Sequence, residues 1–360
     1  MKVEVCRPTE LGDAETVRWS RLQADVESFR HPFLSAEFVL ALGAVSQRTR
    51  VAVVSDGPTI VGFFPFDGNV LGVAKPPAGI LAYRQGFVHQ RGFEWSWSEL
   101  MQHCGLHSLE FTDLVLPQSV GDSRLALLPS PVIDTARGWE DYLQRTKQHK
   151  HIKTIKYKDR KLGRDVGEVE FVWSEKDDRA VATLMTWKSR QYRRSGWRDV
   201  FTRRWVRDLI DVLTASPGGA LRPVVTTLRA ADHLVAVDLS LSYDGVIAGW
   251  FSAYDADFGA YSPGGIRLFR SIEHACAIGT SYIDMARGDE SFKNAIKTGD
   301  AFVGNGSIHR RSALAAVHRA STTPRAAVRS YVLEHPRVRS TVRDSLKRLG
   351  SVRDRMKPDR

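Results

Sequence analysis

The chain has 360 residues, 42% of them hydrophobic, which is enough apolar material for one large or two ordinary globular domains. No run of about 18 apolar residues occurs and the first residues lack the apolar core of a signal peptide, which excludes a membrane-spanning helix and favours a cytoplasmic protein. The three cysteines are far apart and form no Cys-x-x-Cys pair, so we expect neither a disulfide framework nor a metal site.

The net charge of +11 is unevenly distributed along the chain. The segment 309–360 has 14 lysines and arginines against 4 acidic residues, and the segment 147–164 has 8 against 1. The rest of the chain is mildly acidic. This distribution favours an anion bound at particular places over a uniformly basic surface that binds nucleic acid.

Apolar spacing in the first part of the chain predicts two helices followed by a strand hairpin. Helical spacing covers 15–44 and is broken at Pro32, because proline cannot continue a helix. Two apolar runs in 50–68 flank Asp56-Gly57, a dipeptide typical of tight hairpin turns.

The same order of elements returns in the second half. After a strand and a helix at 130–146, where Thr135 is a candidate helix cap, helical spacing covers 177–194 and 203–216. Three strands joined by tight turns follow at 220–255. Helices followed by strands, twice, predict an α/β (α+β) protein built from two related units, although no sequence repeat links them.

Two adjacent glycines precede a predicted amphipathic helix at 266–278. In Ser262-Pro263-Gly264-Gly265 the glycines carry no Cβ, and the first turn of a helix has free N–H groups and the positive end of the helix dipole. A phosphate group could bind there, but the same four residues can equally do no more than start a helix. The phosphate-loop patterns of NTPases and of dinucleotide-binding folds are absent.

The segments "AYDADFGAYSPGG" and "YIDMARGDESFK" carry a resemblance to a known family. Over 135–298 the chain resembles GNAT-fold acetyltransferases of bacterial polysaccharide biosynthesis, the CelD/BcsL-like group, which are relatives of the FemABX aminoacyl transferases. The resemblance implies two tandem GNAT-like domains, each a twisted mixed sheet flanked by helices. It places them at 1–134 and 135–307, with the acyl-CoA site in the second domain and a basic helical tail at 308–360.

The resemblance implies that acetyl-CoA or another acyl-CoA is the co-substrate and that no metal takes part. The pantetheine arm would lie along 246–253 like an added strand, where this strand separates from the one at 282–285. The residues implied to bind the donor are Tyr261, Ser262, Pro263, Gly264, Gly265, Ile266 and Lys293.

Attack by an amine on a thioester needs a base to remove a proton and a donor to stabilise the oxyanion. Asp255 and Asp284 are the candidate bases, and Tyr254 is the candidate acid that protonates the leaving thiolate. Each also has a structural interpretation, with Asp284 as a cap or ion-pair partner and Tyr254 as a half-buried strand residue. The sequence leaves both interpretations open.

The candidates for binding the acceptor combine aromatic, cationic and acidic side chains. Trp187, Arg190 and Tyr192 fall on a helix that would border the acceptor groove, and Asp238 and Asp289 complete the set. Such a mixture suits a small molecule, a sugar or an anionic acceptor, although Trp187 also fits a core position.

The sequence is compatible with three functions. The preferred one is an acyl-CoA-dependent N-acyltransferase, or an O-acyltransferase, that acts on an amine or a sugar such as an envelope-polysaccharide precursor. The second keeps the fold and uses aminoacyl-tRNA as donor, which the two basic segments favour. The third is a non-catalytic GNAT-fold module of a polysaccharide assembly. The basic tail suits an anionic membrane surface, so peripheral association with the inner membrane face is expected, unless the tail packs on the acidic body.

Overall fold

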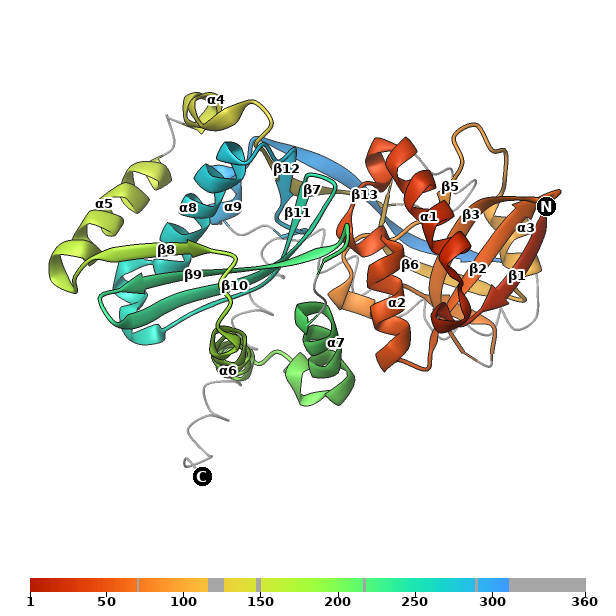
Figure 1. Cartoon of the computed structure of the whole chain (residues 1–360), viewed down its shortest axis with the longest axis horizontal. Helices are drawn as coiled ribbons and strands as arrows, with labels where there is room; N and C mark the ends of the chain where they lie inside the picture. Colours follow the sequence, from red (N-terminus) through yellow and green to blue (C-terminus); the bar gives the residue numbers. More distant parts are fainter. Residues whose placement is uncertain (70, 116–125, 147–149, 216–217, 289–290, 311–360) are drawn as a thin grey trace.

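The computed structural model describes residues 1–310 apart from 70, 116–125, 147–149, 216–217 and 289–290 (Figure 1). The predicted tail therefore lies outside the described residues, except for 308–310. Within the described part, the strands form a 13-stranded sheet in the order β1-β2-β3-β4-β6-β13-β7-β12-β11-β10-β9-β8, and β5 pairs with β3. The prediction of a mixed α/β fold is confirmed.

The first half consists of three helices packed on a small sheet. Its elements are β1 (Lys2–Cys6), α1 (Asp13–Asp25), α2 (Ala36–Val45), β2 (Thr49–Asp56), β3 (Thr59–Gly68), β4 (Val73–Lys75), β5 (Val88–His89), α3 (Trp97–His103) and β6 (Ser108–Val115). After the break at Pro32, α2 begins where the Ser35 hydroxyl accepts a hydrogen bond from the Phe38 amide. Gly57, at φ 57°, supplies the left-handed turn between β2 and β3. The predicted helix pair and hairpin are confirmed.

The second half contains more strands and longer helices. Its elements are β7 (Ala126–Asp134), α4 (Gly138–Thr146), α5 (Lys150–Asp165), β8 (Val169–Trp173), α6 (Asp178–Arg194), α7 (Arg204–Ala215), β9 (Arg222–Ala230), β10 (His233–Tyr243), β11 (Val246–Tyr254), α8 (Pro263–Ala277), β12 (Tyr282–Asp284), α9 (Ser291–Ile296) and β13 (Gly299–His309). The predicted helices and the three strands of 220–255 are confirmed. Thr135 as a helix cap is wrong, because its hydroxyl donates to the Thr280 carbonyl at 2.8 Å instead.

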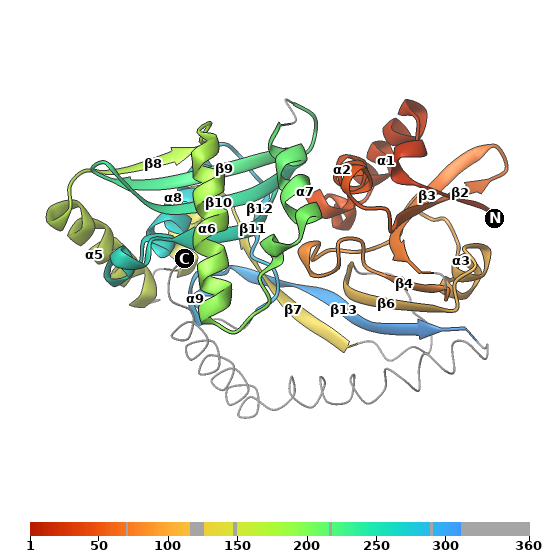
Figure 2. The same cartoon turned by 90° about the horizontal axis from the view of Figure 1, so that it is seen from below.

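Strand β13 belongs to both halves of the molecule. It pairs with β7 over 299–305 and with β6 over 303–309, antiparallel in both cases. Figure 2 shows it running from one lobe to the other. The two units therefore share one continuous sheet rather than forming separate ones.

Helices cover both faces of the β8–β11 part of the sheet, with α6 and α7 on one face and α5 and α8 on the other (Figure 1). The apolar core under α6 and α7 continues into the first half, where it includes Trp19, Phe33 and Phe38. A second core lies between α8 and the opposite face. Because one core joins the halves, the first half packs directly against the strands that carry the site described below.

Candidate active site

Strands β11 and β12 pair for a short distance and then separate. Their parallel register comprises three residue pairs, the last of which joins Ala248 to Asp284. Beyond this point β11 continues to Tyr254 while paired on its other side with β10. Over 249–254, β11 has no strand partner on the β12 side within the described residues. The split leaves backbone N–H and C=O groups that an extended ligand could pair with.

Local features of both strands produce the split. A β-bulge inserts one extra residue, Trp250, into β11, and a bulge bends its strand. On the other strand, the Met285 amide turns away and donates to the Pro131 carbonyl of β7 at 3.1 Å. Ala286 then adopts a left-handed φ of 58°, and its amide donates to the Asp284 carboxylate at 2.8 Å. The chain thus leaves the ladder directly after Asp284.

Helix α8 begins at the open end of the split. Ser262 precedes it with a φ of 54°, and its carbonyl accepts hydrogen bonds from the Gly265 and Ile266 amides at 2.9 and 3.1 Å. The Gly264 amide has no hydrogen-bond partner within the described part of the chain. The Lys158 ammonium of α5 donates to the Ser262 hydroxyl at 2.7 Å. A cation therefore lies beside the positive end of the helix dipole.

The backbone at this helix start is unobstructed. A Cβ built at Gly264 would come no closer than 3.6 Å to another atom, the Tyr254 ring, and one built at Gly265 no closer than 3.7 Å, to Ile155. These are ordinary contact distances, so packing does not require glycine at either position. The absence of side chains instead leaves the amides accessible to a bulky anion.

A cavity of about 630 Å³ joins the helix start to the split strands. Gly249, Ser252 and Tyr254 of β11 contribute to its wall, as do Gly264 and Gly265 of α8. The volume lies in the range of sites for small molecules and cofactors. The helix start therefore faces a cleft rather than bulk solvent or a packed core.

One part of the cavity wall is a buried polar cluster around an ion pair. The Arg267 guanidinium of α8 donates to the Asp238 carboxylate of β10 at 3.1 Å, to Thr226 at 2.9 Å and to Ser271 at 3.2 Å. The Ser240 hydroxyl donates to the second Asp238 oxygen at 2.6 Å. Burial lowers the pKa of Arg267, and the negative charge of Asp238 opposes that shift. The pair brings both charge signs to the cavity without a net charge.

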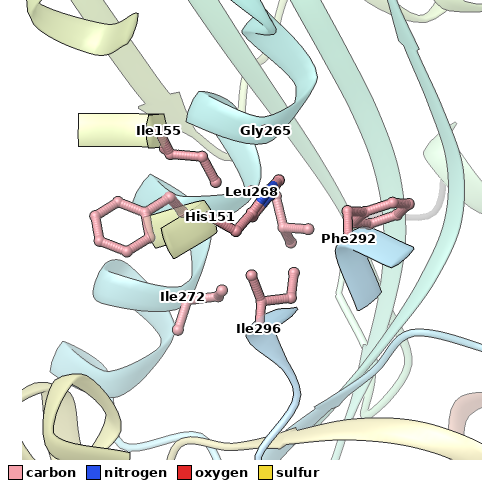
Figure 3. Close-up of a pocket in the computed structure, with 8 residues that line it drawn as sticks. His151, Ile155, Gly265, Leu268, Ile272, Phe292 and Ile296 are labelled. Atoms are coloured by element: carbon pink, nitrogen blue, oxygen red, sulfur yellow. The ribbon is translucent and has the colours of Figure 1, made fainter. Parts of the chain in front are cut away.

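Figure 3 shows a smaller apolar pocket beside the helix start. His151 and Ile155 of α5 meet Leu268 and Ile272 of α8, and Ile296 of α9 closes the far side. The free volume is about 10 Å³, which is enough for one water at most. These contacts bind three helices together and so fix the position of the first turn of α8.

The three catalytic candidates lie in different surroundings. Tyr254 is in the cavity wall at the end of β11 and is 47% exposed. Asp255 accepts a hydrogen bond from the Asp257 amide at 3.1 Å, which caps the short turn η6 (Ala256–Tyr261), and it is not part of the cavity wall. Asp284 contributes to the wall but is otherwise buried.

The Asp284 carboxylate is surrounded by hydrogen-bond donors. It forms an ion pair with Arg84, lies 3.4 Å from both His31 Nε2 and the Ser130 hydroxyl, and accepts from the Ala286 amide. Burial alone would raise the pKa of Asp284, but the charge of Arg84 and the hydrogen bonds from His31 and Ala286 lower it below its ordinary value. Burial lowers the pKa of His31 to about 4, so this imidazole is neutral at neutral pH. An aspartate held ionised in this way is a weak proton acceptor.

Four of the seven donor-binding candidates line the cavity. They are Ser262, Gly264, Gly265 and Lys293. Pro263 and Ile266 are buried in the packing of α8, and the Tyr261 hydroxyl donates to Asp165 at 3.4 Å. The Lys293 ammonium lies 3.4 Å from the Ala286 and Arg287 carbonyls, directly beyond the end of β12.

Helix α6 reaches the cavity with residues that the sequence analysis did not single out. Lys188 and Gln191 line the wall, and the Lys188 ammonium donates to the Ser252 carbonyl at 3.1 Å. Trp187 and Tyr192 pack against the apolar core instead, and Arg190 is exposed. The spacing of Lys188 and Gln191 from the buried Leu184, at one and two helical turns, could have identified this face.

Of the two acidic acceptor candidates, one lies in the described part of the chain. Asp238 lines the cavity, with its carboxylate engaged by Arg267 and Ser240. Asp289 lies outside the described residues. His31 and Arg84 were not candidates at all, since they come from the first half and reach Asp284 only through the fold.

Comparison with known proteins agrees with this geometry. Residues 149–294 match the family model described as an acetyltransferase (GNAT) domain. This stretch of the chain is similar to a GNAT domain. The match covers the split strands and the start of α8. It identifies the protein as an acyltransferase. No curated protein matches the chain.

Several solved structures align with most of this chain. FemX matches at a TM-score of 0.51 with 9% identity, covering 85% of this chain and 96% of that one. A tandem GNAT protein from the clavulanic acid biosynthesis pathway matches at 0.49 with 11% identity, covering 86% and 98%. The C-terminal domain of a putative lysylphosphatidylglycerol synthetase from Agrobacterium fabrum matches at 0.49 with 12% identity, covering 86% and 97%. At these identities a likeness concerns the fold alone, and the FemX match supports it.

Among the described residues, no helix is both long and apolar enough to cross a membrane. No group of three or more histidine, cysteine, aspartate or glutamate side chains there is placed to hold a metal ion.

Proposed function

We propose that the protein is an acyl-CoA-dependent N-acyltransferase, with acetyl-CoA as the simplest donor. The observation that carries this proposal is the open start of α8, where glycine amides and Lys158 face a cavity that continues between β11 and β12. A diphosphate would bind at the amides and the ammonium. The extended pantetheine arm would then pair with the free edge of β11 as an added strand does.

In this arrangement the thioester reaches the cavity near Gly249, where the split begins. The amine nitrogen attacks the thioester carbonyl carbon, the C–S bond breaks, and the sulfur leaves as a thiolate. Tyr254, which lies in the cavity wall, is our candidate for protonating this thiolate. Asp255, next in the chain, is our candidate for taking the amine proton through a water molecule, because Asp284 is held ionised by Arg84.

The acceptor that we propose is a polar amine or an amino sugar, and an envelope-polysaccharide precursor is one such compound. Asp238, Arg267 and the hydroxyls beside them give the cavity donors and acceptors for hydroxyl groups. Trp173 adds an aromatic face to the same wall, and this combination suits a sugar ring. The α6 residues predicted to bind the acceptor, Trp187, Arg190 and Tyr192, do not line the cavity. We therefore propose that Lys188 and Gln191 of α6 contact the acceptor instead.

A second donor, aminoacyl-tRNA, is favoured by one specific feature. Helix α5 carries Lys150, Lys153, Lys156 and Lys158 and runs beside the start of α8, to which Lys158 is bonded. A polyanion crossing this helix would place its acylated end at the same cavity. Binding of such a donor would weaken steeply with salt, because several phosphates would be neutralised at once.

Calorimetry with CoA and with acetyl-CoA tests the first donor. We expect binding by the wild type and its loss in Gly264→Asp, because a carboxylate would stand where the diphosphate binds. Gly264→Ala is the matched control, since its methyl group makes only ordinary contact with Tyr254 and should weaken binding much less. If the wild type does not bind CoA at millimolar concentration but shifts charged tRNA in a gel, the donor is aminoacyl-tRNA and not acyl-CoA.

A further inference from the structure

Helix α6 ends in an exposed and strongly basic segment. Residues 190–204 contain six arginines and one acidic residue, although they belong to the part of the chain that is mildly acidic overall. All six arginines are exposed, and they are Arg190, Arg193, Arg194, Arg198, Arg203 and Arg204. Arg204 lies 3.5 Å from Asp208, and the other five guanidinium groups have no ion-pair or hydrogen-bond partner within the described residues. The segment therefore presents an unbalanced positive charge.

One large aromatic side chain projects from this segment. Trp197 is 63% exposed, and 190–204 contains no other exposed aromatic residue. Gly196 adopts a left-handed φ of 69° and the Trp197 amide donates to the Tyr192 carbonyl at 3.0 Å, as in a Schellman motif at a helix end. The helix end thus fixes the backbone of Trp197, while its indole N–H has no hydrogen-bond partner in the part of the chain that the structure describes.

The arrangement of these side chains indicates an extended partner and not a small anion. Arg190, Arg193 and Arg194 lie on the side of α6 opposite to Tyr192, which packs against the core. None of the six arginines lines the cavity, and neither does Trp197. A small anion is bound by groups that converge in a pocket, whereas these groups are spread over an outer surface.

The charge and the exposed indole together fit an anionic lipid bilayer. Arginine side chains are attracted to anionic headgroups, and tryptophan is enriched in the headgroup layer, where its ring is buried and its N–H stays hydrated. A nucleic acid would also attract the arginines, but proteins that bind single strands stack successive bases on several aromatic side chains. A lone exposed tryptophan among arginines therefore favours the bilayer.

We propose that residues 190–204 are a docking surface for an anionic lipid bilayer, with Trp197 in the headgroup layer and the arginines on lipid phosphates. Gln191 is exposed and lines the cavity, and it lies about one helical turn before Arg194. Docking therefore brings an open side of the cavity to the membrane surface. The proposal does not depend on the donor, because the start of α8 takes no part in it.

Co-sedimentation with vesicles of equal parts phosphatidylglycerol and phosphatidylcholine tests the docking surface. We expect the full chain to bind, and the double variant Arg193→Gln/Arg194→Gln to bind roughly tenfold more weakly. The control is Arg21→Gln/Arg179→Gln, which loses the same charge at two exposed positions outside the segment and should bind as the wild type does. Equal losses in the two double variants, or no binding by the wild type, would overturn the proposal.

Trp197→Ala tests the part played by the indole. Its binding should be severalfold weaker, and the difference from the wild type should persist at high salt, which screens the arginines but not an apolar contact. Ile278→Ala is the control, because Ile278 is 52% exposed at the end of α8. If Trp197→Ala binds vesicles as well as Ile278→Ala does, the indole does not enter the headgroup layer and the proposal is wrong.

Two further measurements separate this proposal from its alternatives. The substituted side chains are exposed, so the thermal midpoints of all variants should stay within a few degrees of the wild type. If the Arg193→Gln/Arg194→Gln variant binds vesicles normally but no longer shifts tRNA in a gel, the segment is a nucleic-acid surface and not a membrane surface. Vesicle binding needs no CoA, so a wild type that fails to bind CoA would overturn the proposed donor alone.

Discussion

Gly62 in the first half and the pair Gly264 and Gly265 in the second have opposite roles. In strand β3 of the first half, Gly62 lies against the Phe87 ring, and an added Cβ would be 2.4 Å from it. Phe87 in turn packs edge-on against Trp95 at 4.7 Å. In the second half, Gly264 and Gly265 have no atom within 3.5 Å of an added Cβ and border the cavity. Gly62 marks close packing, whereas Gly264 and Gly265 mark an accessible backbone, and the surroundings of each glycine decide which.

Breaking the ion pair between Arg84 of the first half and Asp284 of the second should have the largest effect on stability. Arg84→Met removes the cation that faces Asp284 across the two halves and leaves a buried carboxylate without its main partner. We expect the free energy of unfolding to fall by about 3–5 kcal/mol. Urea unfolding measures this change. Arg137→Met is the matched control, because that arginine is exposed and 3.8 Å from Asp134, and its loss should change stability by less than about 1 kcal/mol. Equal effects would contradict a buried link.

The same junction predicts a dependence of stability on pH. The pKa of His31 is lowered by burial from 6.5 to about 4, so between these values the unfolded chain binds more protons than the folded one. Stability is then complete above pH 6.5 and falls by roughly 3 kcal/mol as the pH drops to 4. The lowered pKa of Asp284 adds a loss only at still lower pH.

Urea unfolding of the wild type and of His31→Asn at several pH values between 4 and 7.5 tests this. The variant should show a flatter pH dependence, because it has no imidazole to protonate. An unaltered slope would mean that another group controls acid stability.

Matched glycine substitutions sharpen the contrast between the lobes. Gly62→Ala forces a methyl group into the Phe87 ring and should destabilise the protein by about 1–3 kcal/mol. Gly264→Ala makes only ordinary contacts and should change the free energy of unfolding by less than about 0.5 kcal/mol. Thermal unfolding of both variants measures these losses. A larger loss of stability in Gly264→Ala than in Gly62→Ala would contradict the difference in packing around the two glycines.

The smallest effect is expected at the edge of the donor site. Lys158→Gln keeps a polar group near Ser262 but removes the charge, so CoA affinity should fall roughly threefold, with stability nearly unchanged. Lys153→Gln, on an exposed position of the same helix, serves as control and should leave affinity unaltered. Calorimetry at two salt concentrations separates a local contact from a general loss of positive charge.

Much of the fold was predictable because local patterns determine it. The helices of 15–44, the hairpin at Gly57 and helix α8 follow from apolar spacing, proline and glycine, although α8 begins at Pro263 and not at the predicted residue 266. The open character of the Ser262–Gly265 turn was predicted as well, but the choice between an anion site and a plain helix start needed the cavity.

The rest of the site depends on contacts that sequence patterns do not encode. Arg84 and Asp284 are 200 residues apart, and nothing near either one indicates the pairing. On α6, a shift of one position separates the core residue Trp187 from Lys188 in the cavity wall, so a pattern of residue types could not choose between them. Asp255 illustrates a further difficulty, because an aspartate after a strand serves a turn as readily as a reaction.

Strand β13 also limits how the molecule can be divided. A fragment that ends near residue 134 would lack β13 and so expose the edge of β6 that this strand covers. Unpaired strand edges recruit other chains, so such a fragment should aggregate rather than behave as an independent module. Strand β13 thus holds the two halves together, and a split-protein design would need to supply it in trans to the N-terminal piece.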